Sequence, residues 1–426
     1  MDRPGFYRQA RTDLDGPLHG VRVLDVTTAW SGPMASAILA DLGCEVVRVE
    51  MPRNRAGNVP PAIPGTGLSW FDQTVNRNKR RIGLDLRAPA ARPAFLRLVA
   101  TADVLIENFL AGTLDSWGLG YQQCREVRPD LVMVSITGFG QFGPDAGRRG
   151  YDPIVLAGSG WMALNGADDG VPVKAPTFLA DDLSALHAVI GALAALRHRD
   201  ATGEGQHVDI AMLDAVLSAS DGFLTLAATG EPLRRTGNET DFFVPANSFG
   251  CADGSVYLVA ALDRHWRALA GVIGQPGLAR APGFATNTER LANRAAVNEV
   301  IAAWCAPRPV GEVVAALEAA GIAAGPVRTF AEVAADPHVR ERGMLTDIEL
   351  SNGTHAPLVG PAAKFSRTPT RVRAGAPASG ADTAQILAEL GVSEAELDLL
   401  RLARAADLPA ADLPAESAAA GHQRQP

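Results

Sequence analysis

The chain of 426 residues has few cysteines, and their spacing excludes two kinds of site. Its four cysteines lie far apart and form no CxxC motif. A disulfide framework or a cysteine-based zinc site needs closely spaced cysteines, so neither is expected. The chain also lacks HExxH, HxH and GxSxG motifs, which removes support for zinc hydrolases and serine hydrolases.

Long hydrophobic runs are also missing. The first residues are polar and charged, without the apolar core of a signal peptide. The longest helix-like apolar stretch, 183–196, contains His187 and is too short to cross a bilayer. Acidic residues outnumber basic ones by 47 to 39, which disfavours nucleic acid as a partner. The sequence therefore predicts a cytoplasmic protein that binds neither nucleic acid nor membrane.

What the chain does have is an alternation of strand-like and helical segments. Hydrophobic residues make up 47% of it, enough for a large core. Apolar runs typical of buried strands lie at 21–26, 45–50, 81–86, 103–108, 131–137 and 207–211. Helical segments separate most of them, which predicts an α/β fold with a parallel sheet covered on both faces. A strand at 256–261 with helices around it predicts a second, smaller α+β domain.

Two motifs suggest binding of a phosphate or a nucleotide. GFGQFG at 138–143 matches GxGxxG, but no helix can follow promptly, so we reject a dinucleotide site and predict a loop. The segment 76–87 carries five cations, with only Asp85 opposing them. It is predicted with equal weight as a solvated basic edge or as a site for a nucleotide diphosphate.

Two further positions carry candidate chemistry. Asn108 and Phe109 follow a predicted strand, where parallel sheets bind ligands, although a plain turn with a core Phe is the commoner reason for such a pair. Asp181 and Asp182 precede an apolar helix and are predicted to cap it. A carboxylate at a helix N-terminus is expected to stay ionised, and an oriented carboxylate can act as a nucleophile.

Several segments, in order, resemble the class III CoA-transferase family, which includes formyl-CoA and carnitinyl-CoA transferases. The matching segments are PLHGVRVLDVTTAWSGP, LADLGCEVVRVEMP, NRNKRRIGLDLR, ADVLIENFLAGTLDSWGLGY, RPDLVMVSITGFGQFGP, GYDPIVLAGSG, ALRHRDATGEGQHVDIAMLDAV, GIAAGPV and DPHVRERGM. The resemblance implies a Rossmann-like large domain and a smaller inserted domain, in a homodimer interlocked like linked rings. The expected boundaries are 17–225 and 331–405 for the large domain and 226–330 for the small domain, and the Ala/Pro-rich composition of 406–426 predicts a mobile tail.

The resemblance also implies an activity and its residues. The enzyme would move CoA between organic acids through a covalent aspartyl intermediate, with succinyl-CoA as a common donor. Asp181 matches the nucleophile, and Asp182 is its rival if the alignment slips by one. The CoA contacts would be Thr28, Trp30, Ser31, Leu84, Arg87, Asn108 and Phe109. The partners are an acyl-CoA and a carboxylic acid. No metal or other cofactor is expected, because CoA thioester is the substrate.

Two alternatives remain open at this point. A racemase of α-methylacyl-CoA shares the expected fold but uses a histidine in a Gly-His-Asp segment, where this chain has Tyr151. A tyrosine, with an ordinary pKa near 10, is a poor base for that reaction. A CoA-binding protein without turnover is the second alternative. The acceptor acid is not readable, although Arg148, Arg234 and their neighbouring arginines could bind a second carboxylate.

Overall fold

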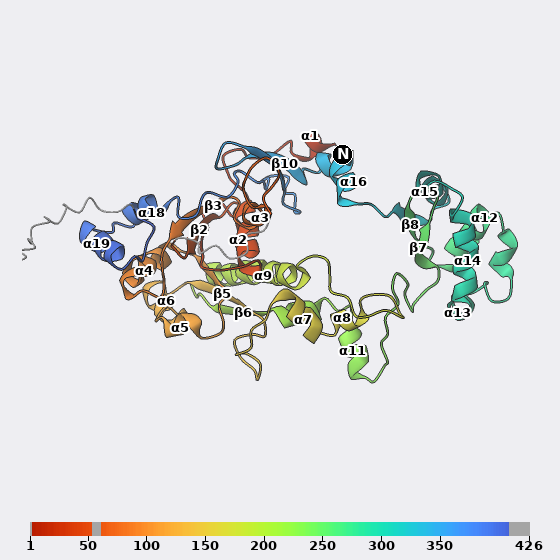
Figure 1. Ribbon diagram of the computed structural model, residues 1–426, viewed down its shortest axis with the longest axis horizontal. Helices are drawn as coiled ribbons and strands as arrows, with labels where there is room; N and C mark the ends of the chain where they lie inside the picture. The colour runs from red at the N-terminus through yellow and green to blue at the C-terminus, as the bar shows by residue number, and fades with distance from the viewer. Residues whose placement is uncertain (1, 53–60, 409–426) are drawn as a thin grey trace, which may run out of the picture. The chain divides into compact units, whose positions relative to one another are not determined.

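The computed structural model describes residues 2–52 and 61–408, which form two compact units (Figure 1). The first unit combines the described residues of 1–158, 176–219 and 340–426, and the second combines 159–175 with 220–339. The domain boundaries expected from the sequence stay a prediction, and they do not include the segment 159–175 in the smaller domain. Most of the predicted tail, from 409 onward, lies outside the described residues.

A six-stranded parallel sheet forms the centre of the first unit, which confirms the predicted α/β fold. Its strands run in the order β3-β2-β1-β4-β5-β6, and every neighbouring pair is parallel. This is the strand order of doubly wound folds. The strands are β1 (Arg22–Asp25), β2 (Glu45–Glu50), β3 (Lys79–Gly83), β4 (Val104–Glu107), β5 (Val132–Thr137) and β6 (His207–Ala211).

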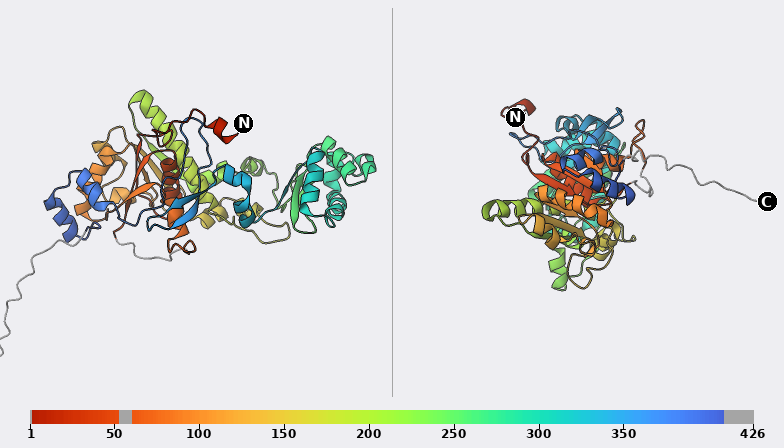
Figure 2. Two further views of the ribbon diagram at one scale, coloured as in Figure 1. Left: turned by 90° about the horizontal axis from the view of Figure 1, so that it is seen from above. Right: turned by 90° about the vertical axis from the view of Figure 1, so that its left-hand side faces the viewer.

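Helices lie on both faces of this sheet (Figure 2). One face packs against α2 (Ser31–Asp41) and α9 (Leu179–Thr202), and the other against α4 (Arg92–Thr101). Leu24, Leu105 and Met133 turn toward the α4 side and share one core with Phe95. Because both faces are covered, the strands are continuous apolar runs rather than alternating ones. Further helices of this unit are α1 (Arg3–Phe6), α3 (Trp70–Val75), α5 (Thr113–Ser116), α6 (Tyr121–Val127), α7 (Asp152–Gly158) and α10 (Met212–Ser218).

Helix α9 is longer than the apolar stretch that the sequence suggested. It spans 24 residues, so by length and hydropathy alone it could cross a membrane, and the prediction that it is too short is wrong. It lies instead against α2, α10, β5 and β6, with small residues such as Ala188 and Ala192 fully buried. These contacts identify α9 as a helix that covers the sheet.

The C-terminal part of the chain also belongs to the first unit. Backbone and side chain of Asp382 hydrogen-bond to Arg81 on the edge strand β3, with 2.7 Å between the carboxylate and the Arg81 backbone nitrogen. The elements here are a hairpin of β10 (Leu345–Glu349) and β11 (His355–Val359), followed by α18 (Thr383–Glu389) and α19 (Glu394–Leu402). Ile386, Leu387 and Leu400 enter the core on the α4 side of the sheet.

The second unit has its own sheet and core. Its three strands, β7 (Ala246–Gly250), β8 (Ser255–Val259) and β9 (Ala323–Pro326), are antiparallel. Trp266 and Leu258 lie at the centre of its core and are fully buried. The helices of this unit are α8 (Trp161–Leu164), α11 (Phe223–Ala228), α12 (Asp263–Val272), α13 (Asn287–Ala292), α14 (Arg294–Cys305), α15 (Val310–Ala319), α16 (Phe330–Ala335) and α17 (Pro337–Glu341).

Three cations of the basic segment 76–87 are buried in ion pairs, so the predicted solvated edge is wrong for them, whereas the predicted site for a nucleotide diphosphate stays a prediction. Lys79 is fully buried, and its ammonium lies 2.9 Å from the buried carboxylate of Asp25. Arg77 is buried 2.8 Å from Asp41, and Arg81 is buried 2.6 Å from Glu50. The opposing carboxylates come from distant parts of the sequence, which is why the segment looked unpaired. These three cations serve the fold rather than a solvated edge.

Lys79 is expected to be essential for stability. Replacing it with Met leaves Asp25 buried with only Arg48 as a cation, so we expect a loss of about 3–5 kcal/mol in the free energy of unfolding. Arg80→Ala is the matched control, because Arg80 pairs with the half-exposed Glu389 and should cost about 0–1 kcal/mol. Chemical denaturation of both variants checks this, and equal losses would contradict the account of Asp25.

Candidate active site

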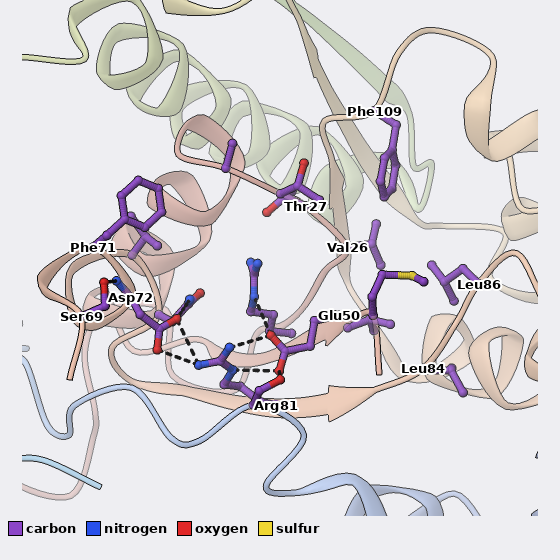
Figure 3. A pocket seen from close by; sticks show the side chains of 18 of the residues that line it. Val26, Thr27, Glu50, Ser69, Phe71, Asp72, Arg81, Leu84, Leu86 and Phe109 are labelled. Atoms are coloured by element: carbon purple, nitrogen blue, oxygen red, sulfur yellow. Dashed lines mark hydrogen bonds and ion pairs between the residues drawn. The ribbon is translucent and has the colours of Figure 1, made fainter. Parts of the chain in front are cut away.

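A pocket of about 530 Å³ lies at the carboxyl ends of the central strands. Residues that follow β1, β2 and β3 line it, together with Phe109 beyond β4. Strand order reverses between β1 and β4, and doubly wound sheets bind ligands at this reversal. In Figure 3, Phe71 lies on one side of the pocket, and Phe109, Leu86 and Leu84 lie on the other.

The floor of the pocket is polar, and its charged side chains are paired with opposite charges. Arg81 bridges Glu50 at 2.6 Å and Asp72 at 2.9 Å, as the dashed lines in Figure 3 mark. Burial opposes the ionised form of Glu50, but hydrogen bonds and the charge of Arg81 outweigh it, so its pKa lies below the ordinary value. Arg48 also lines the pocket and lies 3.2 Å from Asp25. The cations here are already paired with carboxylates.

The turn after β1 is tightly clamped. Asn108 accepts a hydrogen bond from the Thr28 backbone nitrogen at 2.7 Å and donates one to the Thr28 carbonyl at 2.8 Å. The next residue, Ala29, has φ of 57°, a conformation that costs a residue with a Cβ about 1 kcal/mol or more. Strain of this kind persists only where neighbouring contacts enforce it, and the Asn108 clamp does so here.

Two residues of this turn reach the start of α9. Ser31 hydrogen-bonds to Asp181 through both its side chain and its backbone. The indole nitrogen of Trp30 donates to the carboxylate of Asp182 at 2.7 Å. The Asn108 amide lies 3.4 Å from the Ser31 hydroxyl, so the clamp on Thr28 continues into the contact with Asp181. Direct contacts or nearby positions in the chain thus join five of the predicted residues: Thr28, Trp30, Ser31, Asn108 and Asp181.

Asp181 is placed differently from the predicted helix cap. α9 begins at Leu179, so Asp181 and Asp182 lie inside its first turn, and the prediction that they cap it is wrong. Asp152 takes part in that role instead, because its carboxylate accepts a hydrogen bond from the Ala180 backbone nitrogen at 2.7 Å. Sequence reasoning missed Asp152, although the Gly-Tyr-Asp segment that contains it was noted.

The charge state of Asp181 also differs from the expectation. Burial, and then the nearby charge of Asp152, raise the pKa of Asp181 to about 7, although the bonds from Ser31 oppose the rise. Burial likewise raises the pKa of Asp182, against the hydrogen bond from Trp30. The position of these residues at the N-terminus of α9 therefore does not offset the cost of burying the ionised carboxylates, contrary to the prediction. Near neutral pH, Asp181 is protonated in part of the molecules and ionised in the rest.

The remaining predicted CoA contacts divide into two groups. Thr28, Leu84 and Phe109 line the pocket, and Phe109 also packs edge-on against Trp117 with 5.2 Å between ring centroids. Arg87 lies outside the lining, and its guanidinium pairs with Asp85 at 2.9 Å on the surface. As contacts to a bound CoA, all seven residues remain predictions. The loop at 138–143 leads into α7 only at Asp152, in line with its prediction as a loop.

Comparison with known proteins places this chain in one family. The family model described as CoA-transferase family III matches residues 18–383. The succinate–glutarate CoA-transferase of Agrobacterium fabrum is 37% identical over 388 residues, covering 89% of this chain and 96% of that enzyme. The succinyl-CoA:mesaconate CoA-transferase of Haloarcula hispanica is 36% identical over 389 residues, covering 88% and 97%.

A solved structure agrees with these relatives. The crystal structure of a CaiB/BaiF family protein from Brucella suis matches with a TM-score of 0.78 and 34% identity, covering 88% of this chain and all of that one. The protein is therefore a Rossmann-like CoA-transferase. The chain belongs to CoA-transferase family III, and it is an enzyme that transfers CoA between carboxylic acids.

The pKa of Asp181 predicts how stability changes with pH. Because this pKa is raised on folding, the carboxylate costs no stability below about pH 4 and an increasing amount as pH rises toward 7. Asp181→Asn removes that cost, so we expect it to stabilise the fold by about 1–3 kcal/mol at pH 8 and by much less at pH 4. Chemical denaturation at both pH values measures this. The exposed Asp214→Asn is the control, and an equal change at both pH values would contradict the shift.

Proposed function

We propose that Asp181 is the nucleophile that carries the acyl group and then CoA during transfer. The observation that supports this most strongly is the position of its carboxylate. Asp181 is held by Ser31 at the turn that borders the pocket, and it lies in the first turn of α9. A carboxylate fixed in this way has few orientations to lose on reaching the transition state.

The proposed reaction keeps the acyl group activated throughout. An oxygen of Asp181 attacks the thioester carbonyl of the donor, the C–S bond breaks, and a mixed anhydride and CoA thiolate result. The thiolate attacks the aspartyl carbonyl, which releases the donor acid and leaves an aspartyl thioester. The carboxylate of the acceptor attacks that thioester, the C–S bond breaks, and a second anhydride and CoA thiolate result. CoA thiolate then attacks the acceptor's carbonyl, and Asp181 is free again.

The surroundings of Asp181 suit this role. A pKa of about 7 keeps part of the population ionised near neutrality and makes the carboxylate a stronger nucleophile than an ordinary, more acidic one. Asp182 is less suited, because its carboxylate is already bonded to the indole of Trp30. Asp152 supports the reaction indirectly, since its bond to the Ala180 backbone holds the first turn of α9.

The names of the relatives guide the choice of substrates. Several are succinyl-CoA or succinate transferases, so we propose succinyl-CoA as a donor for this enzyme. CoA enters as part of the substrate, and every bond change above uses only Asp181, CoA and two acids. The proposal therefore needs neither a metal nor a separate cofactor. We place the enzyme in the cytoplasm, where its four free cysteines would remain reduced.

We also propose that the enzyme is a homodimer, in the interlocked form that the family resemblance implies. The outer face of α9 supports this, because Leu186 is 50% exposed and Ile190 is 60% exposed one turn further along. Apolar side chains on one face of a helix commonly mark a contact with another molecule. Light scattering of the purified protein is expected to give twice the mass of one chain.

Trapping of the acyl-enzyme tests the proposed function. The protein is incubated with succinyl-CoA, treated with hydroxylamine and digested, and the peptides are examined by mass spectrometry. A hydroxamate is expected at Asp181, and Asp181→Asn should abolish both it and turnover. Asp182→Asn is the matched control and should keep the label at Asp181.

Other outcomes of this experiment contradict the proposal. A hydroxamate at Asp182 would mean that the neighbouring residue is the nucleophile. Loss of deuterium from the α-position of a 2-methylacyl-CoA, with no hydroxamate from any donor, would indicate a racemase. The exposed Tyr151 lends that reaction no support, because it stands where the racemases carry a histidine.

A further inference from the structure

Four aromatic side chains from three segments of the first unit meet beside Asp181. Trp30 is at their centre, with its ring centroid 4.9 Å from Phe71 and 4.8 Å from Phe178. Trp70 completes the group at 6.0 Å from Trp30 and 5.8 Å from Phe71. We call these four residues the aromatic wall.

The aromatic wall is attached directly to the nucleophile's neighbours. Trp30 precedes Ser31, which bonds to Asp181, and its indole donates to Asp182, which follows Asp181. Phe178 immediately precedes α9, and its carbonyl accepts from the Asp182 backbone nitrogen at 2.9 Å. Phe71 lines the pocket, so the wall connects the pocket to the residues on either side of the nucleophile in the sequence. A group attached to the reacting carbonyl would therefore lie next to it.

Part of the wall is open. Trp30 is only 8% exposed and is held on its edges by the other rings, whereas Trp70 is 38% exposed and Phe178 is 39% exposed. Single exposed apolar residues are common, but two large rings packed at a tilt against a buried third form a contiguous apolar surface. Rings present a flat face to other rings and to hydrocarbon chains and lose little freedom on contact.

Charge near Asp181 disfavours a second carboxylate at this surface. The two charged groups that act on Asp181 are the carboxylates of Asp152 and Asp182. The arginines considered from the sequence are largely occupied: Arg148 pairs with Asp145, Arg234 pairs with Asp241, and Arg235 donates to three backbone carbonyls. An uncharged substituent meets no such repulsion here.

We propose that the aromatic wall is a specificity subsite, and that one of the two acids exchanged carries an apolar body, an aromatic ring or a branched hydrocarbon chain. This deepens the proposed function and rests on it, because the subsite acts on a group joined to the carbonyl that Asp181 attacks. Trp70 and Phe178 contact this body with their open faces, and Trp30 holds both rings and Asp182 in position. The other acid can still be succinate, with its second carboxylate directed away from the wall and from the two carboxylates that act on Asp181.

The test compares two donors that differ in their apolar body. Phenylacetyl-CoA and acetyl-CoA are each assayed with succinate as acceptor, for the wild-type enzyme, Trp70→Ala and Phe178→Ala. We expect the wild-type enzyme to favour phenylacetyl-CoA by about tenfold in kcat/KM. Each variant should lose about five- to tenfold with phenylacetyl-CoA, mainly in KM, and less than twofold with acetyl-CoA. Trp70→Leu keeps an apolar side chain and should recover part of the loss.

Controls separate the wall from general effects of an exposed ring. Phe330→Ala removes a highly exposed phenylalanine of the second unit and should leave the ratio of the two donors unchanged. Equal losses with both donors, or no preference in the wild-type enzyme, would overturn the proposal. A change of molecular mass by light scattering without a change in donor preference would show that the rings contact a second copy instead, and would also overturn it.

Failure of the subsite can be told apart from failure of the proposed function. Hydroxamate formation at Asp181 with succinyl-CoA reports the nucleophile whatever the preferred acyl body. Binding of phenylacetyl-CoA and acetyl-CoA to Asp181→Asn, measured by calorimetry, reports the subsite without turnover. If Trp70→Ala in that background weakens binding of phenylacetyl-CoA alone, the subsite stands even where no hydroxamate forms. If Trp70→Ala weakens the binding of neither thioester, or weakens the binding of both equally, the subsite is refuted.

Discussion

The buried carboxylate of Asp25 is the constraint on which the rest of the site depends. It accepts hydrogen bonds from Thr27 and Ser36 and lies against two cations, Arg48 and Lys79. Asp25 ends β1, and its partners come from the turn after β1, from α2, from β2 and from β3, so one charge ties together the elements around the pocket. A buried charge is tolerated only where it is fully partnered, and its loss of partners is correspondingly costly. The turn that positions Ser31 begins two residues after this anchor.

Two sets of carboxylates in the first unit have pKa values shifted in opposite directions. Asp25 is fully buried and Glu50 is half-buried, both against cations, and their pKa values lie below the ordinary range despite burial. Asp181 is half-buried beside other carboxylates, and its pKa is raised to about 7. Paired charges stabilise a scaffold, whereas an unpaired and desolvated carboxylate is typical of a reactive group. The contrast distinguishes the residues that hold the pocket from the one proposed to react in it.

A parallel sheet with helices on both faces could be predicted from the sequence, because continuous apolar runs separated by helical segments are typical of that arrangement, whereas the order of its strands was not predicted. The strand 45–50 and the strand 207–211 have the predicted bounds. The burial of the basic segment in ion pairs could not be predicted, because the carboxylates that neutralise Lys79 and Arg81 are distant in sequence. The raised pKa of Asp181 depends on burial and then on the charge of Asp152, and both arise only in the folded chain. The aromatic wall likewise joins three separate segments.

Transfer of oxygen from substrate to Asp181 tests the central claim most directly. The enzyme is allowed to turn over with succinyl-CoA and succinate labelled with oxygen-18 in its carboxyl groups. In the proposed reaction, attack of CoA on the acyl carbonyl of the second anhydride leaves the bridging oxygen on the aspartate. Mass spectrometry of the peptide should then find oxygen-18 at Asp181 and none at Asp182. Exchange of CoA between the acids without label at Asp181 would contradict a covalent aspartyl intermediate.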